Sequence, residues 1–306
     1  MTAAAQVRGE ALAGAPREFP FHAEHFRVIS ERIYQFSGIR LPEAKREMVY
    51  ARLARRLRAL GIASFDDYVR YLELEPAEWE HCTNALTTNV TAFYREEHHF
   101  RTLAAYALAH AGGGPFRVWS AGCSTGEEPY TIAMCLAETL GEAPWEVLAT
   151  DLDTQVLATA REGVYPLASV LKLSPERQKG FFQRGVGRFE GRARVRRGLA
   201  SRIEFKRLNL MDREWDVQSP LDAIFCRNVM IYFDKPTQAR LIERFARLVK
   251  PHGLFFAGHA ESLLDNGRHF RLIGQTVYEL VTTLPPTLSQ ARGSERGTRF
   301  REDERK

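Results

Sequence analysis

The sequence predicts two domains: an all-helical N-terminal domain, followed by an α/β domain built on a doubly wound, mainly parallel sheet. Residues 21–88 show helical periodicity without any strand-like run, whereas the chain from residue 116 onward alternates short apolar runs with helical patterns. Residues 112–115, Gly-Gly-Gly-Pro, separate the two halves and are typical of a linker. Because strands that alternate with helices form parallel βαβ units, the second half is expected to be the α/β domain.

Four helices are expected in the N-terminal half. Glycine ends the first two, since it readily takes the left-handed conformation after a helix. Proline starts the second and the fourth, and serine caps the third. The signals are Gly38, Pro42, Gly61, Ser64 and Pro76, which predict helices over about 23–36, over 42–60, from 64 and from 76.

The α/β half divides by the same kind of signal. Predicted strands cover 116–123, 145–150, 203–208, 221–226 and 253–257, predicted helices cover 127–140, 153–162 and 236–249, and a terminal hairpin pairs 270–273 with 277–281. Glycines at 185, 187, 191 and 198 break the alternation and predict a small β-hairpin insertion. The expected division is a flexible tail (1–18), a helical domain (19–90), a linker helix and Gly-rich linker (91–115), an α/β domain (116–284) with an insertion (181–202), and a disordered tail (285–306).

Composition sets broad limits on function. The 306 residues are 44% hydrophobic and 26% charged, as in ordinary globular proteins. No apolar run approaches the roughly 20 residues of a membrane span, and the N-terminus lacks the apolar stretch of a signal peptide. None of the four cysteines is in CxxC spacing, so neither a metal site nor a disulfide framework is indicated and a cytoplasmic location is expected. The net charge of +5 favours an anionic partner, which could be nucleic acid, lipid or an acidic protein.

The first motif is the turn after the strand that starts at residue 116. Gly122 and Gly126 allow the backbone to approach a ligand closely. The spacing is neither GxGxxG nor a P-loop, which disfavours a pyrophosphate ligand. Glu127 and Glu128 favour a ligand with an amino group, a sulfonium or ribose hydroxyls. The alternative is a plain βα turn whose acidic residues interact with the helix dipole.

Polar residues also follow two later strands. Asp151 and Asp153 end the second strand; Asp153 is expected to cap the next helix and Asp151 to face a ribose. Alternatively, both are caps. Arg227 and Asn228 follow the strand 221–226, with Tyr232 shortly after. The alternative is that Arg227 is a surface ion-pair residue and Tyr232 belongs to the core.

Three further features are weaker. Residues 87–96 carry many side-chain donors near the domain junction, which suits either a cleft lining or a capping loop. The second helix carries cations opposite its apolar side, either as a solvated face or as a contact surface for an acidic helix; they are Lys45, Arg52, Arg55 and Arg56. Cys123 has no paired histidine in the sequence, and the neighbours His98 and His99 are expected to point apart on a helix, so neither is expected to form a reactive or metal site.

Together, six segments resemble the chemotaxis receptor methyltransferase family (CheR): TTNVTAFYRE (87–96), VWSAGCSTGEEPY (118–130), ATDLD (149–153), RLNLMD (207–212), IFCRNVMIYFDK (224–235) and GLFFAGHAESL (253–263). The resemblance covers about residues 20–282. It implies a Rossmann-like S-adenosyl-L-methionine-dependent methyltransferase domain with a small β-subdomain insertion, preceded by an all-helical N-terminal domain. It also implies that glutamate γ-carboxylates of chemotaxis receptor cytoplasmic domains become methyl esters for sensory adaptation, with S-adenosyl-L-homocysteine as the second product.

The resemblance also implies which residues form the site. Carried over motif by motif, cofactor contacts fall on Asn89, Thr91, Arg95, Glu127, Asp151, Asn209, Leu210, Arg227 and Asn228, and the residues nearest the transferred methyl are Arg95 and Tyr232. No metal is implied. The insertion is similar to the subdomain that, in some members, binds a receptor C-terminal peptide by strand addition.

The implied chemistry agrees with the residues. A glutamate side chain has a reference pKa near ~4.3, so it is an anionic nucleophile at neutral pH and needs no general base. Two other functions stay open at this stage. One is methylation of nucleic acid, which the basic charge favours, although residues 227–230 lack the Asp/Asn-Pro-Pro-aromatic motif of amino-methylating DNA enzymes. The other is a non-catalytic signalling module.

Overall fold

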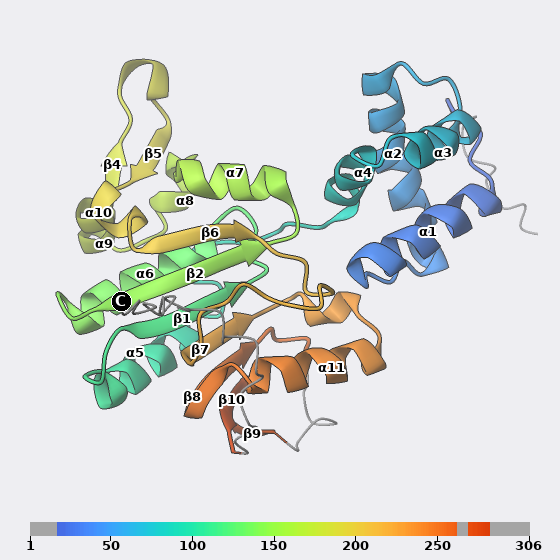
Figure 1. Cartoon of the computed structure of the whole chain (residues 1–306). Coiled ribbons are helices and arrows are strands. Elements are labelled where there is room, and N and C mark those ends of the chain that lie inside the picture. The colour runs from blue at the N-terminus through green and yellow to red at the C-terminus, as the bar shows by residue number, and fades with distance from the viewer. Residues whose placement is uncertain (1–16, 262–268, 282–306) are drawn as a thin grey trace, which may run out of the picture.

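The computed structural model describes residues 17–261 and 269–281, and Figure 1 shows the helical and α/β domains side by side. The expected tails, 1–18 and 285–306, lie outside this part apart from residues 17 and 18. The N-terminal domain holds α1 (Ala23–Ser37), α2 (Arg46–Leu60), α3 (Phe65–Leu74) and α4 (Glu78–Leu86). A short 3-10 turn, Glu43–Lys45, follows Pro42, so α2 starts later than expected.

The local signals in this domain act as predicted. Gly38 and Gly61 end α1 and α2 in the left-handed conformation, with φ of 70° and 68°. The Ser64 side chain accepts the Asp67 N–H at the start of α3. The four helices enclose a core of their own, with Ile29, Leu53 and Phe65 fully buried.

The α/β domain is organised around a seven-stranded sheet in the order β6-β2-β1-β7-β8-β10-β9. The strands are β1 (Phe116–Ala121), β2 (Trp145–Asp151), β6 (Ile203–Arg207), β7 (Leu221–Cys226), β8 (Val249–Ala257), β9 (Phe270–Gly274) and β10 (Val277–Leu280). β1, β2, β6, β7 and β8 are parallel, and the β9–β10 hairpin adds antiparallel strands at the edge, as predicted.

Helices cover both faces of this sheet. Three lie on one face, α5 (His98–His110), α6 (Glu127–Leu140) and α7 (Thr154–Glu162), and α11 (Lys235–Ala246) lies on the other. Side chains alternate along β7 between two cores: Phe225 packs with α5 and α6, whereas Ile224 packs with α11. This two-sided burial explains why the strand sequences are nearly continuous apolar runs.

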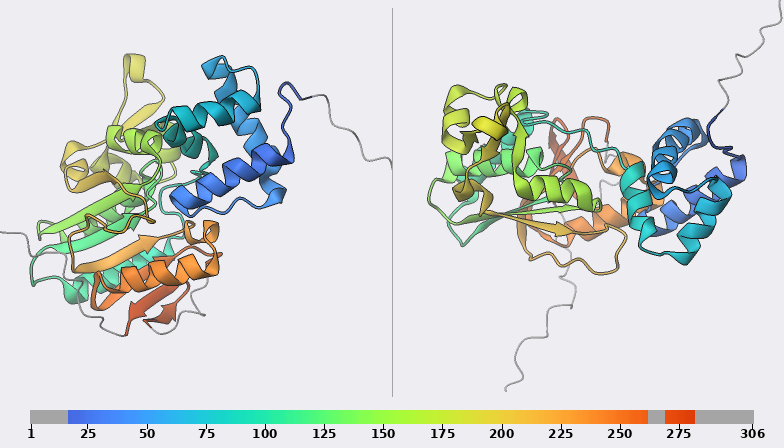
Figure 2. Two further views of the ribbon diagram at one scale, coloured as in Figure 1. Left: turned by 45° about the vertical axis from the view of Figure 1, so that its right-hand side comes forward. Right: turned by 90° about the horizontal axis from the view of Figure 1, so that it is seen from above.

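The insertion forms a separate three-stranded antiparallel sheet, which projects from the domain (Figures 1 and 2). The predicted hairpin is present as β4 (Phe182–Arg184) and β5 (Arg192–Val195). Sequence reasoning missed its third strand, β3 (Val164–Pro166), which pairs with β5 and lies outside the predicted range 181–202. Three short helices accompany this sheet: α8 (Leu167–Val170), α9 (Pro175–Phe181) and α10 (Arg197–Ala200).

Polar contacts join the two domains. The Tyr34 hydroxyl donates to Asp234 at 2.6 Å, and the Arg40 N–H donates to the Tyr232 carbonyl at 2.8 Å. Thr87 donates to the Asp153 carboxylate at 2.9 Å. Among the helices of residues 17–261 and 269–281, none has the length and apolar content required to cross a bilayer.

Candidate functional site

A cavity of about 420 Å³ lies where the carboxyl ends of β1, β2 and β7 meet the N-terminal domain. Its walls come from both domains, in agreement with a binding site at the switch point of a doubly wound sheet. The N-terminal half contributes Ser37, Ile39, Leu41, Lys45, residues 86–92 and Arg95. The α/β domain contributes Gly122, Ser124, Glu128, residues 150–152, 208–210, 227–229 and 231–233, and Ala260.

The glycine turn after β1 forms one wall. Gly122 has φ of +92°, and a Cβ there would lie 2.4 Å from Val229 Cγ2, so only glycine fits. The Ser124 N–H donates to Asp151 at 2.8 Å, which ties this turn to the end of β2. The turn is therefore held open for a ligand by backbone conformation and by one buried carboxylate.

Asp151 and Asp153 separate as the sequence predicted. Asp153 caps α7 by accepting the Gln155 N–H at 2.9 Å and the Val156 N–H at 3.3 Å. Asp151 lines the cavity and accepts the Asp153 N–H at 2.9 Å. Burial raises the pKa of Asp151 to about 6. The alternative in which both residues only cap the helix does not hold.

Arg227 lies at the inner end of the cavity and is not the surface ion-pair residue considered as the alternative. Its side chain is 2% exposed, 3.0 Å from Glu128 and 3.5 Å from Glu96. It also donates to the Arg95 carbonyl at 2.5 Å, so it connects strand β7 to the loop that carries Arg95. Burial raises the pKa of Glu128, against the opposing effect of Arg227. The cavity thus contains one buried cation and one buried anion side by side.

Five further residues predicted as cofactor contacts also line the cavity, namely Asn89, Thr91, Asn209, Leu210 and Asn228. The amide of Asn209 donates to the Phe36 carbonyl at 2.6 Å, so this side chain also joins the domains. Asn228 has φ of +60°, and its N–H donates to Glu261 at 2.8 Å. Glu261 was not selected from the sequence, although it lies in the quoted segment 253–263.

Arg95 and Tyr232 both line the cavity, and Tyr232 is half-buried there, outside the core. The Arg95 guanidinium donates to the Val90 carbonyl at 2.9 Å. Lys45 approaches from the N-terminal domain, with its Nζ 5.1 Å from the centre of the Tyr232 ring. The sequence alone indicates Lys45 only as part of a charged helix face, because its proximity to Tyr232 depends on how the domains pack.

Glu127 is the one predicted contact that does not line the cavity. Its carboxylate accepts the Thr125 hydroxyl at 2.6 Å, and its neighbour Glu128 lines the cavity instead. Consecutive helical residues point about 100° apart, so the motif alone could not decide which glutamate faces inward.

The cations of α2 are mostly used inside the domain. Arg56 pairs with the buried Glu78 at 2.5 Å, and Arg52 donates to the carbonyls of residues 85–87. Of the four cations named above, Arg55 is exposed, whereas Arg52, Arg56 and Lys45, which lies in the preceding 3-10 turn, are half-buried. The solvated-face and contact-surface interpretations therefore both miss the role of Arg52 and Arg56, which is to hold α4 and the start of the 87–96 loop.

His98 and His99 do not point apart, contrary to expectation. Their ring centres are 4.1 Å apart, because both Nε2 atoms converge on the Gln275 carbonyl, at 3.0 and 3.3 Å. With Glu96 they form a group whose potential ligand atoms lie within 4.8 Å of one another. Arg227 lies 3.5 Å from Glu96, and this fixed positive charge disfavours a metal cation there.

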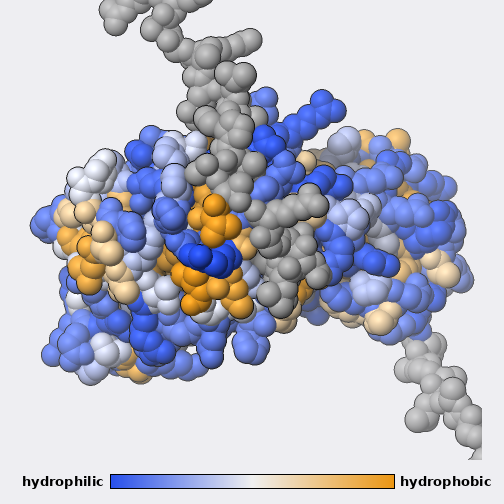
Figure 3. Space-filling view, turned by 90° about the horizontal axis from the view of Figure 1, so that it is seen from below, coloured by the Kyte–Doolittle hydropathy of each residue, from blue (hydrophilic) through white to orange (hydrophobic). Residues whose placement is uncertain are grey.

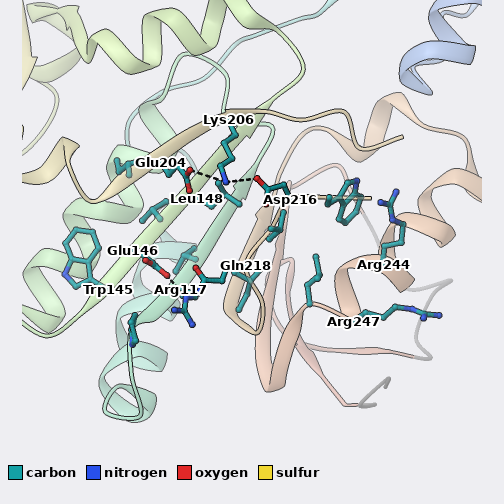
Figure 4. Close-up of a pocket in the computed structure, with 18 of the residues that line it drawn as sticks. Arg117, Trp145, Glu146, Leu148, Glu204, Lys206, Asp216, Gln218, Arg244 and Arg247 are labelled. Atoms are coloured by element: carbon teal, nitrogen blue, oxygen red, sulfur yellow. Dashed lines mark hydrogen bonds and ion pairs between the residues drawn. The ribbon is translucent and has the colours of Figure 1, made fainter. Parts of the chain in front are cut away.

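A larger hollow of about 1480 Å³ lies over the part of the sheet that α11 leaves uncovered (Figure 4). Some of its charged side chains pair with one another: Lys206 lies 3.1 Å from Glu204 and 3.0 Å from Asp216, and Arg117 pairs with Glu146. It contains none of the residues predicted for the site, so the smaller cavity is the candidate active site.

Comparison with known proteins identifies the family of this chain. Residues 24–87 match the family model for the CheR methyltransferase all-alpha domain, and residues 89–279 match that for the CheR methyltransferase SAM binding domain. The chain is 52% identical to the chemotaxis protein methyltransferase of Klebsiella aerogenes, over 90% of this chain and 96% of that protein. It is 54% identical to the chemotaxis protein methyltransferase of Salmonella typhimurium, over 84% and 90% of the two chains. The chain therefore belongs to the CheR methyltransferase family, and S-adenosylmethionine is its cofactor.

Proposed function

We propose that this chain transfers the methyl group of S-adenosylmethionine to glutamate side chains of chemotaxis receptor cytoplasmic domains, forming methyl esters in the cytoplasm. The observation that carries the proposal is the single cavity that brings Asp151, Glu128 and Arg227 together with Arg95 and Tyr232. The relatives from Klebsiella aerogenes and Salmonella typhimurium are chemotaxis protein methyltransferases, which indicates the biological setting.

The residues fit the cofactor in size and chemistry. A cavity of about 420 Å³ lies in the usual range for small-molecule sites. Asp151 offers carboxylate oxygens to ribose hydroxyls. Asn209 and Asn228 offer amides to the base. Glu128 and Arg227 carry the charges that complement an α-amino and an α-carboxylate group.

When bound, the cofactor supplies an electrophilic methyl group on a sulfonium. The acceptor glutamate is already ionised at neutral pH, so the protein has to position it and exclude water. The Arg95 guanidinium donates a hydrogen bond to the Val90 carbonyl at 2.9 Å, and it can exchange this bond for one to the carboxylate of the incoming acceptor. Tyr232, from the α/β domain, orients the acceptor. Lys45, from the N-terminal domain, lies close to the Tyr232 ring and attracts the acceptor carboxylate.

The inserted sheet is the proposed contact for a receptor C-terminal peptide. β4 forms one edge of the order β3-β5-β4, so its outer backbone groups can accept an added strand. Arg184 at the end of β4 and Arg192 at the start of β5 are exposed, and both would attract an acidic peptide or its terminal carboxylate.

A methyl-transfer assay tests the proposal. With tritiated cofactor, receptor cytoplasmic fragments should acquire label that alkali releases, because methyl esters hydrolyse in base. Fragments lacking their C-terminal peptide should be labelled more slowly. The Arg95→Ala variant should retain some cofactor binding by calorimetry and lose turnover. Label on DNA or RNA, or alkali-stable label on protein, would contradict the proposal.

A further inference from the structure

Two large apolar side chains that line the cavity are left open to solvent. Val90 is 78% exposed and Ile231 is 49% exposed. Such exposure is not unusual by itself: Leu108 in α5 is 69% exposed and lines neither hollow, and the face in Figure 3 shows hydrophobic areas scattered among hydrophilic ones. The position of Val90 and Ile231 beside the proposed acceptor residues is what sets them apart.

Val90 is fixed relative to Arg95. Its carbonyl accepts the Arg95 guanidinium at 2.9 Å. The preceding carbonyl, that of Asn89, accepts the Ser124 hydroxyl at 3.0 Å, which anchors the loop to the glycine turn. The exposed Val90 side chain is therefore held at the mouth of the cavity by the same contacts that place Arg95.

Ile231 is fixed in the same way relative to Tyr232. It lies in the 3-10 turn Met230–Tyr232, and its N–H donates to the buried Glu261 carboxylate at 3.3 Å. The Tyr232 carbonyl accepts the Arg40 N–H at 2.8 Å from the N-terminal domain. Two domains thus hold this turn, and Ile231 stays exposed on it.

We propose that Val90 and Ile231 form an apolar rim that selects acceptors whose methylated carboxylate is flanked by apolar side chains. The inference rests on the proposed function and adds the surface chemistry of its substrate. A carboxylate that reaches Arg95 and Tyr232 brings its neighbouring residues onto the rim. Apolar neighbours remove water from both rim side chains. Charged neighbours would lose hydration against them without gaining a hydrogen-bond partner.

The test compares Val90→Ser, Ile231→Ser and the double variant with the parent enzyme and with Leu108→Ser, an exposed apolar control away from the cavity. Each rim variant should raise the KM for a receptor cytoplasmic fragment ~3- to 10-fold, as expected for partial loss of apolar burial. Calorimetric affinity for the fragment without cofactor should fall in parallel. The Kd for S-adenosylmethionine should stay within about twofold of the parent value, and Leu108→Ser should match the parent.

A second experiment varies the receptor fragment instead of the enzyme. Replacing apolar residues beside the modified glutamate with serine should weaken methylation by the parent and have less effect on the double variant, since coupled residues are not additive. The proposed role of the rim would be refuted by an unchanged KM for the receptor fragment in the double variant. It would also be refuted if the double variant lost as much affinity for the cofactor as for the fragment. A parent enzyme that places no alkali-labile label on any receptor fragment would instead refute the proposed function, and the rim with it.

Discussion

At the scale of single residues, Asp151 and Asp153 show how identical side chains two positions apart take different roles. Asp153 follows the end of β2 directly before α7, so its carboxylate meets two free helix N–H groups. Asp151 accepts the N–H groups of Ser124 and Asp153 and faces the cavity. Two backbone donors do not offset its burial, and its pKa rises to about 6.

This raised pKa predicts a pH-dependent cofactor affinity. Ribose hydroxyls donate most strongly to an ionised carboxylate. As the pH falls through about 6, Asp151 becomes protonated. At pH 5 about a tenth remains ionised, so the calorimetric Kd for S-adenosylmethionine should be ~10-fold higher than at pH 7.5. Between about pH 4 and 6 the folded chain also holds a proton that the unfolded chain has lost, so this group's contribution to the unfolding free energy falls as pH rises.

Asp151→Asn is the matched variant for that measurement. It should bind the cofactor weakly at both pH values, with little remaining pH dependence. Burial also raises the pKa of Glu128, so any slope that persists in Asp151→Asn belongs to that residue. A parent enzyme with equal affinity at pH 5 and 7.5 would contradict the ribose role of Asp151.

At the scale of elements, the inserted sheet supports the glycine turn after β1, which lies in the proposed cofactor site. Tyr165 on β3 is buried, and its hydroxyl donates to the Thr125 carbonyl at 2.7 Å. A Cβ at Gly126 would lie 2.7 Å from the same hydroxyl. Phe93, from the 87–96 loop, packs edge-on against Tyr165 and against Phe182 on β4. The insertion, the glycine turn and the loop of Arg95 therefore share one set of contacts.

Tyr165→Phe should show whether this support affects the cofactor. Tyr130→Phe is the control, because the Tyr130 hydroxyl is equally buried and donates to the Ala160 carbonyl at 2.9 Å. Each variant should lower the free energy of unfolding in urea by about 1–2 kcal/mol, since a buried carbonyl loses its donor. Only Tyr165→Phe should also raise the cofactor Kd, by ~3- to 10-fold. Equal cofactor affinity in the two variants would restrict Tyr165 to a stabilising role.

Local signals explain why most elements could be predicted and β3 could not. Gly38, Gly61, Ser64 and Asp153 act within a few residues of themselves, so their effects can be inferred from the sequence. β3 has three residues and exists through its register with β5, about 30 residues later. The same limit applies in the cavity, where Lys45 reaches Tyr232 only because the two domains pack together.

At the scale of the whole molecule, the N-terminal domain forms part of the wall of the proposed cofactor cavity. Figure 2 shows it beside the α/β domain in both views. Ser37, Ile39 and Leu41 line the cavity, and Gly38 packs so closely that a Cβ would lie 2.6 Å from the Met211 sulfur. The helical domain is therefore expected to respond to the cofactor as well as to the acceptor.

Hydrogen exchange measured by mass spectrometry tests that expectation. Saturating S-adenosylhomocysteine should slow exchange in residues 122–128 and also in residues 37–45, because a ligand that contacts both walls opposes the opening that separates them. The Arg40 amide is the most informative probe, since it donates across the interface to Tyr232. Residues 65–74 of α3 contribute nothing to the cavity and should exchange at the same rate with and without ligand. Protection confined to residues 122–128 would show that the α/β domain binds the cofactor alone.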